Sequence, residues 1–110
     1  MVMIYKLLKK QQRLALFPDH IKDKNHYTFF IFKTVGKPFW VKDKDGNSLQ
    51  AILRHKREQR LSEIPMCERR AFCDRYSVSE AMFKSQWNRK PPILIEVEIL
   101  KVNETERLFA

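Results

Sequence analysis

Residues 93–102 constrain the fold most, because their apolar side chains alternate with the two-residue period of a strand. One side of the extended chain carries four branched apolar residues: Ile93, Ile95, Val97 and Ile99. The other side carries Glu96 and Glu98 between Leu94 and Leu100, so that only its middle is polar. A strand of this kind buries its apolar side against a second layer and pairs with other strands. We therefore expect a sheet in which Glu96 and Glu98 face solvent and pair with Lys or Arg of a neighbouring strand.

Two shorter stretches predict further strands. Residues 27–34 are rich in aromatic and β-branched side chains, and this run is too short for a typical helix. Residues 38–44 alternate between apolar and polar side chains after a break that contains Gly36. We expect both stretches to join the sheet.

Asp45-Gly46 is the strongest hairpin signal in the chain, because a type I′ turn needs positive φ at both of its central residues. A two-residue turn at this point predicts a strand over residues 48–55 and pairs Trp40 with Ala51. The competing interpretation is a helix over the same stretch, which Ser48 would cap and which good helix formers would continue. We favour the hairpin, although the period of the apolar residues does not decide between the two.

Three helices complete the expected fold. Residues 3–17 place apolar side chains near helical spacing, up to a Phe-Pro break. Residues 65–75 begin with a proline that suits a first helical turn, and residues 78–87 follow a capping box that starts at Ser77. The predicted fold is a single α+β domain over residues 1–110. Its antiparallel sheet of three to four strands packs against an N-terminal helix and a helix pair in the C-terminal half.

The composition predicts a folded cytoplasmic protein. Hydrophobic residues make up 44% of the chain, which is enough to offset the ordering entropy. No apolar run approaches the roughly 18 residues of a membrane span, and lysines interrupt the region where a signal peptide would be apolar. Cys67 and Cys73 are too far apart in a helix for an easy disulfide, so we expect free thiols that act as small buried hydrophobes. Neither the cysteines nor the histidines show the short spacing of a zinc site, so we expect no metal and no cofactor.

The charge of the chain predicts an anionic partner. Its formal net charge is +9, from 22 Lys and Arg against 13 Asp and Glu, which exceeds the roughly 2 to 8 that suits a small soluble domain. Such a field attracts polyanions through phosphate contacts and counterion release. The densest basic run is residues 54–60. Because the last twenty residues are net acidic, we expect Glu96 and Glu98 to lie away from the nucleic-acid footprint.

We expect the nucleic-acid site to combine this basic run with two lysines and one tryptophan. Arginine offers phosphates a planar fork, lysine offers a point charge, and an exposed indole stacks on an unpaired base. On a strand, Trp40 shares a face with Lys42 and Lys44, whereas core packing is the better account of most other aromatic residues. The predicted site residues are Arg54, Lys56, Arg57, Arg60, Lys42, Lys44 and Trp40.

No motif indicates catalysis. The chain has only two glycines, which excludes a glycine-rich phosphate-binding loop, and no histidine and carboxylate share a diagnostic spacing. The favoured function is therefore non-catalytic binding of DNA or RNA, mainly through phosphates. The first alternative is a protein-interaction module that binds and modulates an acidic partner protein, of the kind that viruses and mobile elements encode. The second is a small nuclease or toxin.

Overall fold

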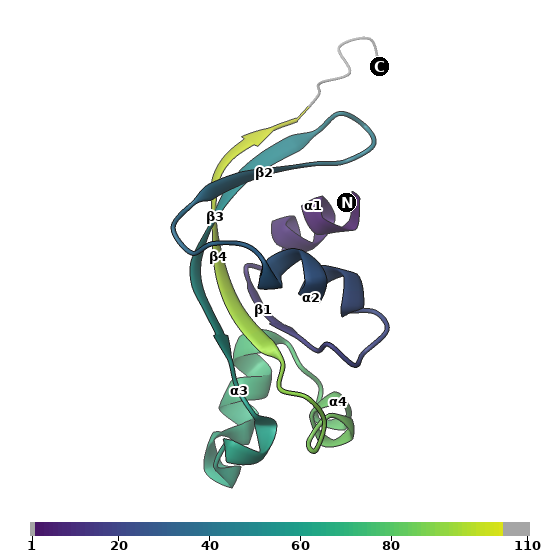
Figure 1. Ribbon diagram of the computed structural model, residues 1–110, viewed down its shortest axis with the longest axis vertical. Helices are drawn as coiled ribbons and strands as arrows, with labels where there is room; N and C mark the ends of the chain where they lie inside the picture. Colours follow the sequence, from purple (N-terminus) through teal and green to yellow (C-terminus); the bar gives the residue numbers. More distant parts are fainter. Residues whose placement is uncertain (1, 105–110) are drawn as a thin grey trace.

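The computed structural model describes residues 2–104, which form one four-stranded antiparallel sheet with helices around it (Figure 1). The strands lie in the order β1, β4, β3, β2, so that two long strands form the centre and two short strands form the edges. Their bounds are Arg13–Leu16 for β1, Pro38–Lys42 for β2, Ser48–Glu58 for β3 and Ile93–Asn103 for β4.

Helices cover the two faces of the sheet unequally. Helices α1 and α2 lie along one face, and α3 and α4 lie at the end of the sheet where β4 begins (Figure 1). Alternation along β1 separates the two packing regions, because Leu14 and Leu16 join the main core whereas Ala15 packs among residues of the α3–α4 region. The helices and 3-10 turns are α1 (Val2–Lys10), α2 (Lys24–Ile31), η1 (Leu61–Glu63), η2 (Met66–Glu68), α3 (Arg69–Tyr76) and α4 (Glu80–Ser85). The α+β prediction is confirmed, including the N-terminal helix and the helices of the C-terminal half.

The main core lies between the sheet and the α1–α2 layer. The apolar side of β4 enters it as the alternation predicts, since Ile93, Ile95 and Val97 are all buried. Leu8 of α1 and Phe30 of α2 meet this side of the sheet and are fully buried. Burial of these apolar side chains is the main favourable contribution to the free energy of folding.

A second apolar cluster joins α3 and α4 to the other face of the sheet. Its buried members are Phe17, Leu61, Ile64, Cys73 and Phe83. Both cysteines are free thiols, and Cys73 is buried as predicted, whereas Cys67 is exposed, so the prediction of burial is wrong for Cys67. Burial raises the pKa of the Cys73 thiol, which keeps it protonated and unreactive at neutral pH.

The prediction of a strand over residues 27–34 is wrong, because most of this stretch belongs to α2. His26 and Phe30 are buried and lie four residues apart, as the inner face of a helix requires. Phe29 contacts Phe30 and Phe39 edge-on, with ring centroids 4.9 and 5.9 Å apart. Aromatic residues generally favour strands, but here their rings pack onto the sheet from a helix, and this packing decides the secondary structure.

The helix predicted over residues 3–17 is correct only in its first half. Helix α1 ends at Lys10, and the second half of the stretch becomes the edge strand β1. The side chain of Gln11 holds the turn between them, because its Nε2 donates to the carbonyl oxygens of Arg13 at 2.6 Å and Tyr76 at 3.0 Å. The register of β1 against β4 supplies the hydrogen bonds that a longer helix would have made internally.

Strands β2 and β3 form the predicted hairpin, so the competing helix over the same stretch is excluded. The register differs from the prediction by one residue, because Trp40 pairs with Gln50 and not with Ala51. The pair that closes the strands is Lys42 with Ser48.

The turn itself is longer than the predicted two residues. The amide of Asp43 donates to the carbonyl of Asn47 at 2.9 Å, and the side chain of Asp43 accepts the amides of Asp45 and Asn47. Gly46 has φ of 86°, the left-handed conformation that closes a three-residue hairpin loop. The glycine is thus required for positive φ, as predicted, within a different turn type.

Both helices predicted in the C-terminal half are present with shifted bounds. The 65–75 helix begins as a 3-10 turn and continues as α3, and the 78–87 helix shortens to α4. The predicted capping box does not form, because Ser77 ends α3 with a left-handed φ of 54°. Ser79 caps α4 instead, and its Oγ accepts the amide of Met82 at 3.1 Å.

Candidate nucleic-acid interface

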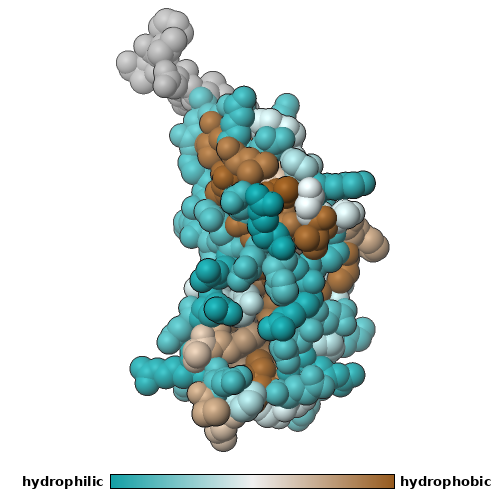
Figure 2. Space-filling model, turned by 90° about the vertical axis from the view of Figure 1, so that its left-hand side faces the viewer, coloured by the Kyte–Doolittle hydropathy of each residue, from teal (hydrophilic) through white to brown (hydrophobic). Residues whose placement is uncertain are grey.

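The face of the sheet opposite α1 and α2 carries the candidate site. Figure 2 shows the molecule from this side, with hydrophilic residues over most of the surface and hydrophobic residues gathered among them, most densely in the upper half and again in a smaller group in the lower half. Strand register places Trp40, Gln50 and Lys101 in one row across β2, β3 and β4. We call this surface the open face, and its residues are Arg13, Trp40, Lys42, Gln50, Ile52, Arg54, His55, Arg57, Glu96, Glu98 and Lys101.

A β-bulge decides which residues of the basic run reach the open face. Leu53 pairs with Val97 and His55 pairs with Glu96, so Arg54 is the extra residue on β3. The bulge shifts the in–out alternation by one residue. Arg54 is exposed at the bulge, and His55 and Arg57 follow on the open face rather than pointing into the core.

Lys56 points the other way, toward the helical layer. Its Nζ donates to the carbonyl oxygens of Ile31 at 3.0 Å and Lys33 at 2.7 Å. These carbonyls lie at the C-terminal end of α2, where the last turn leaves acceptors without helical partners and a cation is favourable. The structure therefore separates Lys56 from the other predicted site residues.

Two of the cations on the open face are paired with the carboxylates of β4. Arg54 Nη2 lies 2.6 Å from Glu98, and Arg13 Nε lies 3.5 Å from Glu96. The expectation that Glu96 and Glu98 pair with basic residues of neighbouring strands is confirmed. The expectation that they lie away from the predicted footprint is wrong, because β4 is central and places them beside Arg54.

Three other cations on the open face carry no such partner within residues 2–104. Lys42, Arg57 and Lys101 are exposed, and none of them forms an ion pair with a carboxylate of this part of the chain. Lys101 lies in the row that contains Trp40 and Lys42 lies next to that row, whereas Arg57 lies farther along β3, near α3. The net charge of the open face is therefore positive despite its two carboxylates.

Trp40 is the exposed aromatic residue of the open face. Its neighbours on β2, Phe39 and Val41, are buried in the core, whereas 46% of the Trp40 surface remains accessible. Large apolar side chains are usually buried, so the exposure of this indole is informative. Its position on a strand leaves the ring available for contact with a ligand. Its neighbours in the row, Gln50 and Lys101, offer hydrogen-bond donors next to the ring.

The remaining predicted residues lie at the margins of the open face. Lys44 is exposed in the β2–β3 turn, beyond the end of β2. Arg60 is exposed directly before η1, beyond the end of β3. The structure thus brings Trp40, Lys42, Arg54 and Arg57 onto one surface.

Sequence reasoning missed Arg13 and Lys101 as members of this surface. Lys101 falls within the strand predicted over residues 93–102, but its neighbour Trp40 follows only from the register of three strands. Arg13 falls in a stretch for which the sequence predicts a helix. No local pattern in the sequence signals either position.

Two features are absent from the part of the chain that the structure describes. Within residues 2–104 no three His, Cys, Asp or Glu side chains converge on a possible metal site. None of the helices in these residues is long and apolar enough to cross a membrane.

Comparison with known protein families, with curated proteins and with solved structures finds no match for this chain. A function for this protein is therefore inferred from its own residues and their arrangement.

Proposed function

We propose that this protein binds single-stranded nucleic acid on the open face of its sheet. The observation that carries the proposal is the half-exposed indole of Trp40, which lies on β2 next to Lys42 and in the same row as Lys101. An aromatic platform with cations beside it is the usual arrangement for binding unpaired bases and their phosphates.

Single strands fit this surface better than duplexes. In a duplex the bases already stack on one another, so an exposed indole gains little contact. Phosphate contacts from Lys42, Arg57 and Lys101 carry no base preference, and stacking accepts every base. We therefore expect weak sequence preference, with DNA and RNA strands both bound.

The test measures the affinity of single-stranded DNA, single-stranded RNA and duplex DNA by fluorescence anisotropy at two salt concentrations. Trp40→Ala should weaken binding of both single strands about 5- to 150-fold, which corresponds to the ~1–3 kcal/mol of one base–aromatic stack. Trp40→Phe should retain most of the affinity. Affinity should fall with salt, with a slope that decreases by about 0.7 for each phosphate contact removed.

Two control variants separate the site from general effects. Phe32→Ala removes an aromatic side chain that is 83% exposed at the C-terminal end of α2, away from the open face. Lys22→Ala removes an exposed cation from the loop that leads into α2. Both variants should bind like the unmodified protein. Equal losses in Trp40→Ala and Phe32→Ala, or binding insensitive to salt, would overturn the proposal.

The leading alternative, docking on an acidic partner protein, predicts a different result. An acidic protein captured equally well before and after nuclease treatment, together with no binding of any single strand, would support it.

A further inference from the structure

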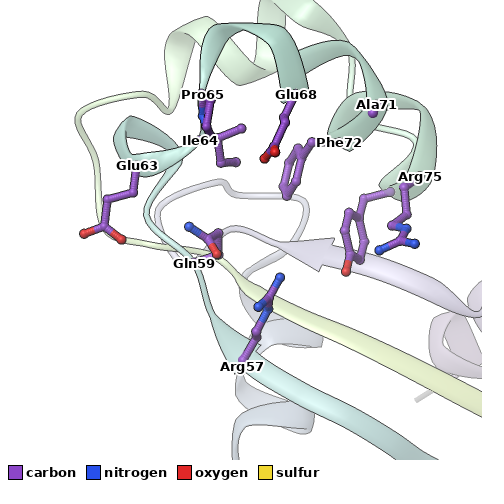
Figure 3. Close-up of a pocket in the computed structure, with 10 residues that line it drawn as sticks. Arg57, Gln59, Glu63, Ile64, Pro65, Glu68, Ala71, Phe72 and Arg75 are labelled. Carbon is purple, nitrogen blue, oxygen red and sulfur yellow. The ribbon is translucent and has the colours of Figure 1, made fainter.

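A pocket of about 370 Å³ opens where the lower end of β3 meets α3. Figure 3 shows Arg57 rising from β3 on one side and Glu68, Phe72 and Arg75 on the opposite side, from η2 and α3. Gln59 lies beside Arg57. The pocket therefore combines two arginines, two carboxylates, an amide and an aromatic ring, and Figure 3 shows Glu63 at the side of the pocket farthest from Arg75.

The two arginines give the pocket a site for a phosphate. Arg57 and Arg75 are exposed, and neither forms an ion pair within the described residues. Guanidinium groups bind phosphate oxygens through paired N–H donors. A phosphodiester inside a strand carries one negative charge, whereas a terminal phosphate carries about 1.5 to 2 at pH 7. Two arginines therefore match a terminal phosphate better than an internal one.

The other residues of the pocket match a nucleobase. The ring of Phe72 is half-buried, and its centroid lies 5.1 Å from that of Tyr76, so an apolar wall is already formed. Glu68 and Gln59 add hydrogen-bond acceptors to the same lining. Carboxylates accept hydrogen bonds from the exocyclic amino groups of bases. This mixed lining favours a whole nucleotide over a simple anion, because the aromatic ring and the hydrogen-bonding groups can contact a base in addition to the phosphate.

The position of the pocket suits the end of a bound nucleic-acid strand. A single strand that lies along β3 from Trp40 passes Arg54 and then reaches Arg57, where α3 closes the open face. The region beyond is filled by the second apolar cluster around Phe83. A nucleic-acid strand that ends at this point avoids α3, whereas a continuous strand would have to turn away from the sheet to pass it.

We propose that this pocket receives the terminal nucleotide of the bound strand, with Arg57 and Arg75 on its phosphate and Phe72, Gln59 and Glu68 around its base. The proposal rests on the proposed function. It adds that the protein distinguishes free ends from continuous strands.

The test compares one DNA sequence in four forms: a closed single-stranded circle, and linear strands with a 5′-phosphate, a 3′-phosphate or no phosphate. One of the two phosphorylated strands should bind about tenfold more tightly than the circle, and the result assigns the polarity. Arg75→Ala should abolish this difference and leave binding of the circle unchanged. Arg70→Ala is the matched control, because Arg70 is an exposed arginine of α3 that does not line the pocket.

A second variant tests the base contact. With the preferred end phosphorylated, a terminal cytosine should bind several-fold more tightly than a terminal thymine, because only cytosine donates through an amino group. Glu68→Ala, which removes the acceptor, should reduce this preference without changing affinity for the circle.

The outcomes separate the two proposals. If circle and linear strands bind equally and Trp40→Ala weakens both, the end pocket is overturned and the open-face site stands. If Arg75→Ala weakens the circle as much as the linear strands, the pocket belongs to an internal path and the end proposal is overturned. If no single-stranded form binds, both proposals are overturned.

Discussion

Lys56 connects the central strand β3 to the end of α2 through two hydrogen bonds to backbone carbonyls. A charged donor stabilises such acceptors more than a neutral donor does. The same contact explains why a residue in the middle of a basic run contributes to the fold and is turned away from the open face.

Lys56→Met keeps the length and apolar stem of the side chain and removes the charge. We expect it to lower the free energy of unfolding by about 1–3 kcal/mol, because the carbonyls of Ile31 and Lys33 lose a charged donor. Urea denaturation measures this change. Arg57→Met on the neighbouring position should change stability by less than ~0.5 kcal/mol, as for an ordinary surface residue. Equal effects of the two variants would contradict the assigned role of Lys56.

His26 is a residue whose titration should be visible in the stability of the protein. Burial on the inner face of α2 lowers the pKa of His26, although the carboxylate of Asp23 opposes the shift. The unfolded chain, in which the His pKa is near 6.5, therefore binds the proton more readily than the folded chain. The contribution of His26 to stability is complete above about pH 6.5 and is lost as the pH falls below that value.

Urea denaturation at pH 7.5 and at pH 5.5 tests this sign. The unmodified protein should lose more stability between the two pH values than His26→Leu, which cannot titrate at this position. His20 and His55 remain in both proteins, so the difference between the two slopes reports on His26. A steeper pH dependence in His26→Leu would contradict the assigned direction of the shift.

At the scale of elements, the β2–β3 turn depends on one glycine. Gly46 has φ of 86°, and a β-branched side chain resists this conformation. Gly46→Val should therefore lower the free energy of unfolding by at least about 1–2 kcal/mol. The control Asp45→Ala changes an exposed side chain of the same turn and should cost less than ~0.5 kcal/mol. A loss for Gly46→Val that is as small as the control would argue against positive φ at this position.

The elements that the sequence predicted correctly are those whose signals are local. Alternation along residues 93–102 is itself the cause of β4, and the glycine of the β2–β3 turn is required by its φ. In contrast, α2 and β1 depend on partners distant in sequence. The aromatic residues of α2 pack on the sheet, and β1 exists because β4 offers it a register. Local propensity alone cannot anticipate either contact.

The candidate site was predictable to a similar extent. Trp40 and Lys42 share a face because strand β2 alternates regularly, and the sequence shows this period. The bulge at Arg54 is different, since it arises where β3 and β4 must pair with unequal numbers of residues. The bulge places Lys56 on the core side and Arg57 on the open face, the reverse of regular alternation. No residue type in the basic run predicts a bulge.

At the scale of the whole molecule, the two faces of the sheet differ in how far they are covered. One face holds the main core under α1 and α2, and the other face holds the second cluster at one end and stays open at the other. Because β4 is a central strand, its carboxylates cannot be segregated from the basic residues of β3. The positive charge that the composition predicts is therefore moderated by Glu96 and Glu98 on the surface where we propose nucleic acid binds.

Carboxylates at a remote edge would leave nucleic-acid binding unchanged, whereas carboxylates on the open face should weaken it. Neutralising both, in Glu96→Gln with Glu98→Gln, releases Arg13 and Arg54 from their ion pairs and removes two charges that repel phosphates. Since each exposed pair is worth ~0.2–1 kcal/mol, the loss of two pairs should raise the affinity for single-stranded DNA by at most about 2- to 30-fold at low salt, with little change in stability. The effect should shrink at high salt, because screening weakens exposed charges. Anisotropy titrations measure it, and Glu80→Gln on α4 serves as the control outside the open face. Loss of a nucleic-acid cleavage activity in the double variant, with fold and binding intact, would instead make these carboxylates catalytic and the protein a nuclease.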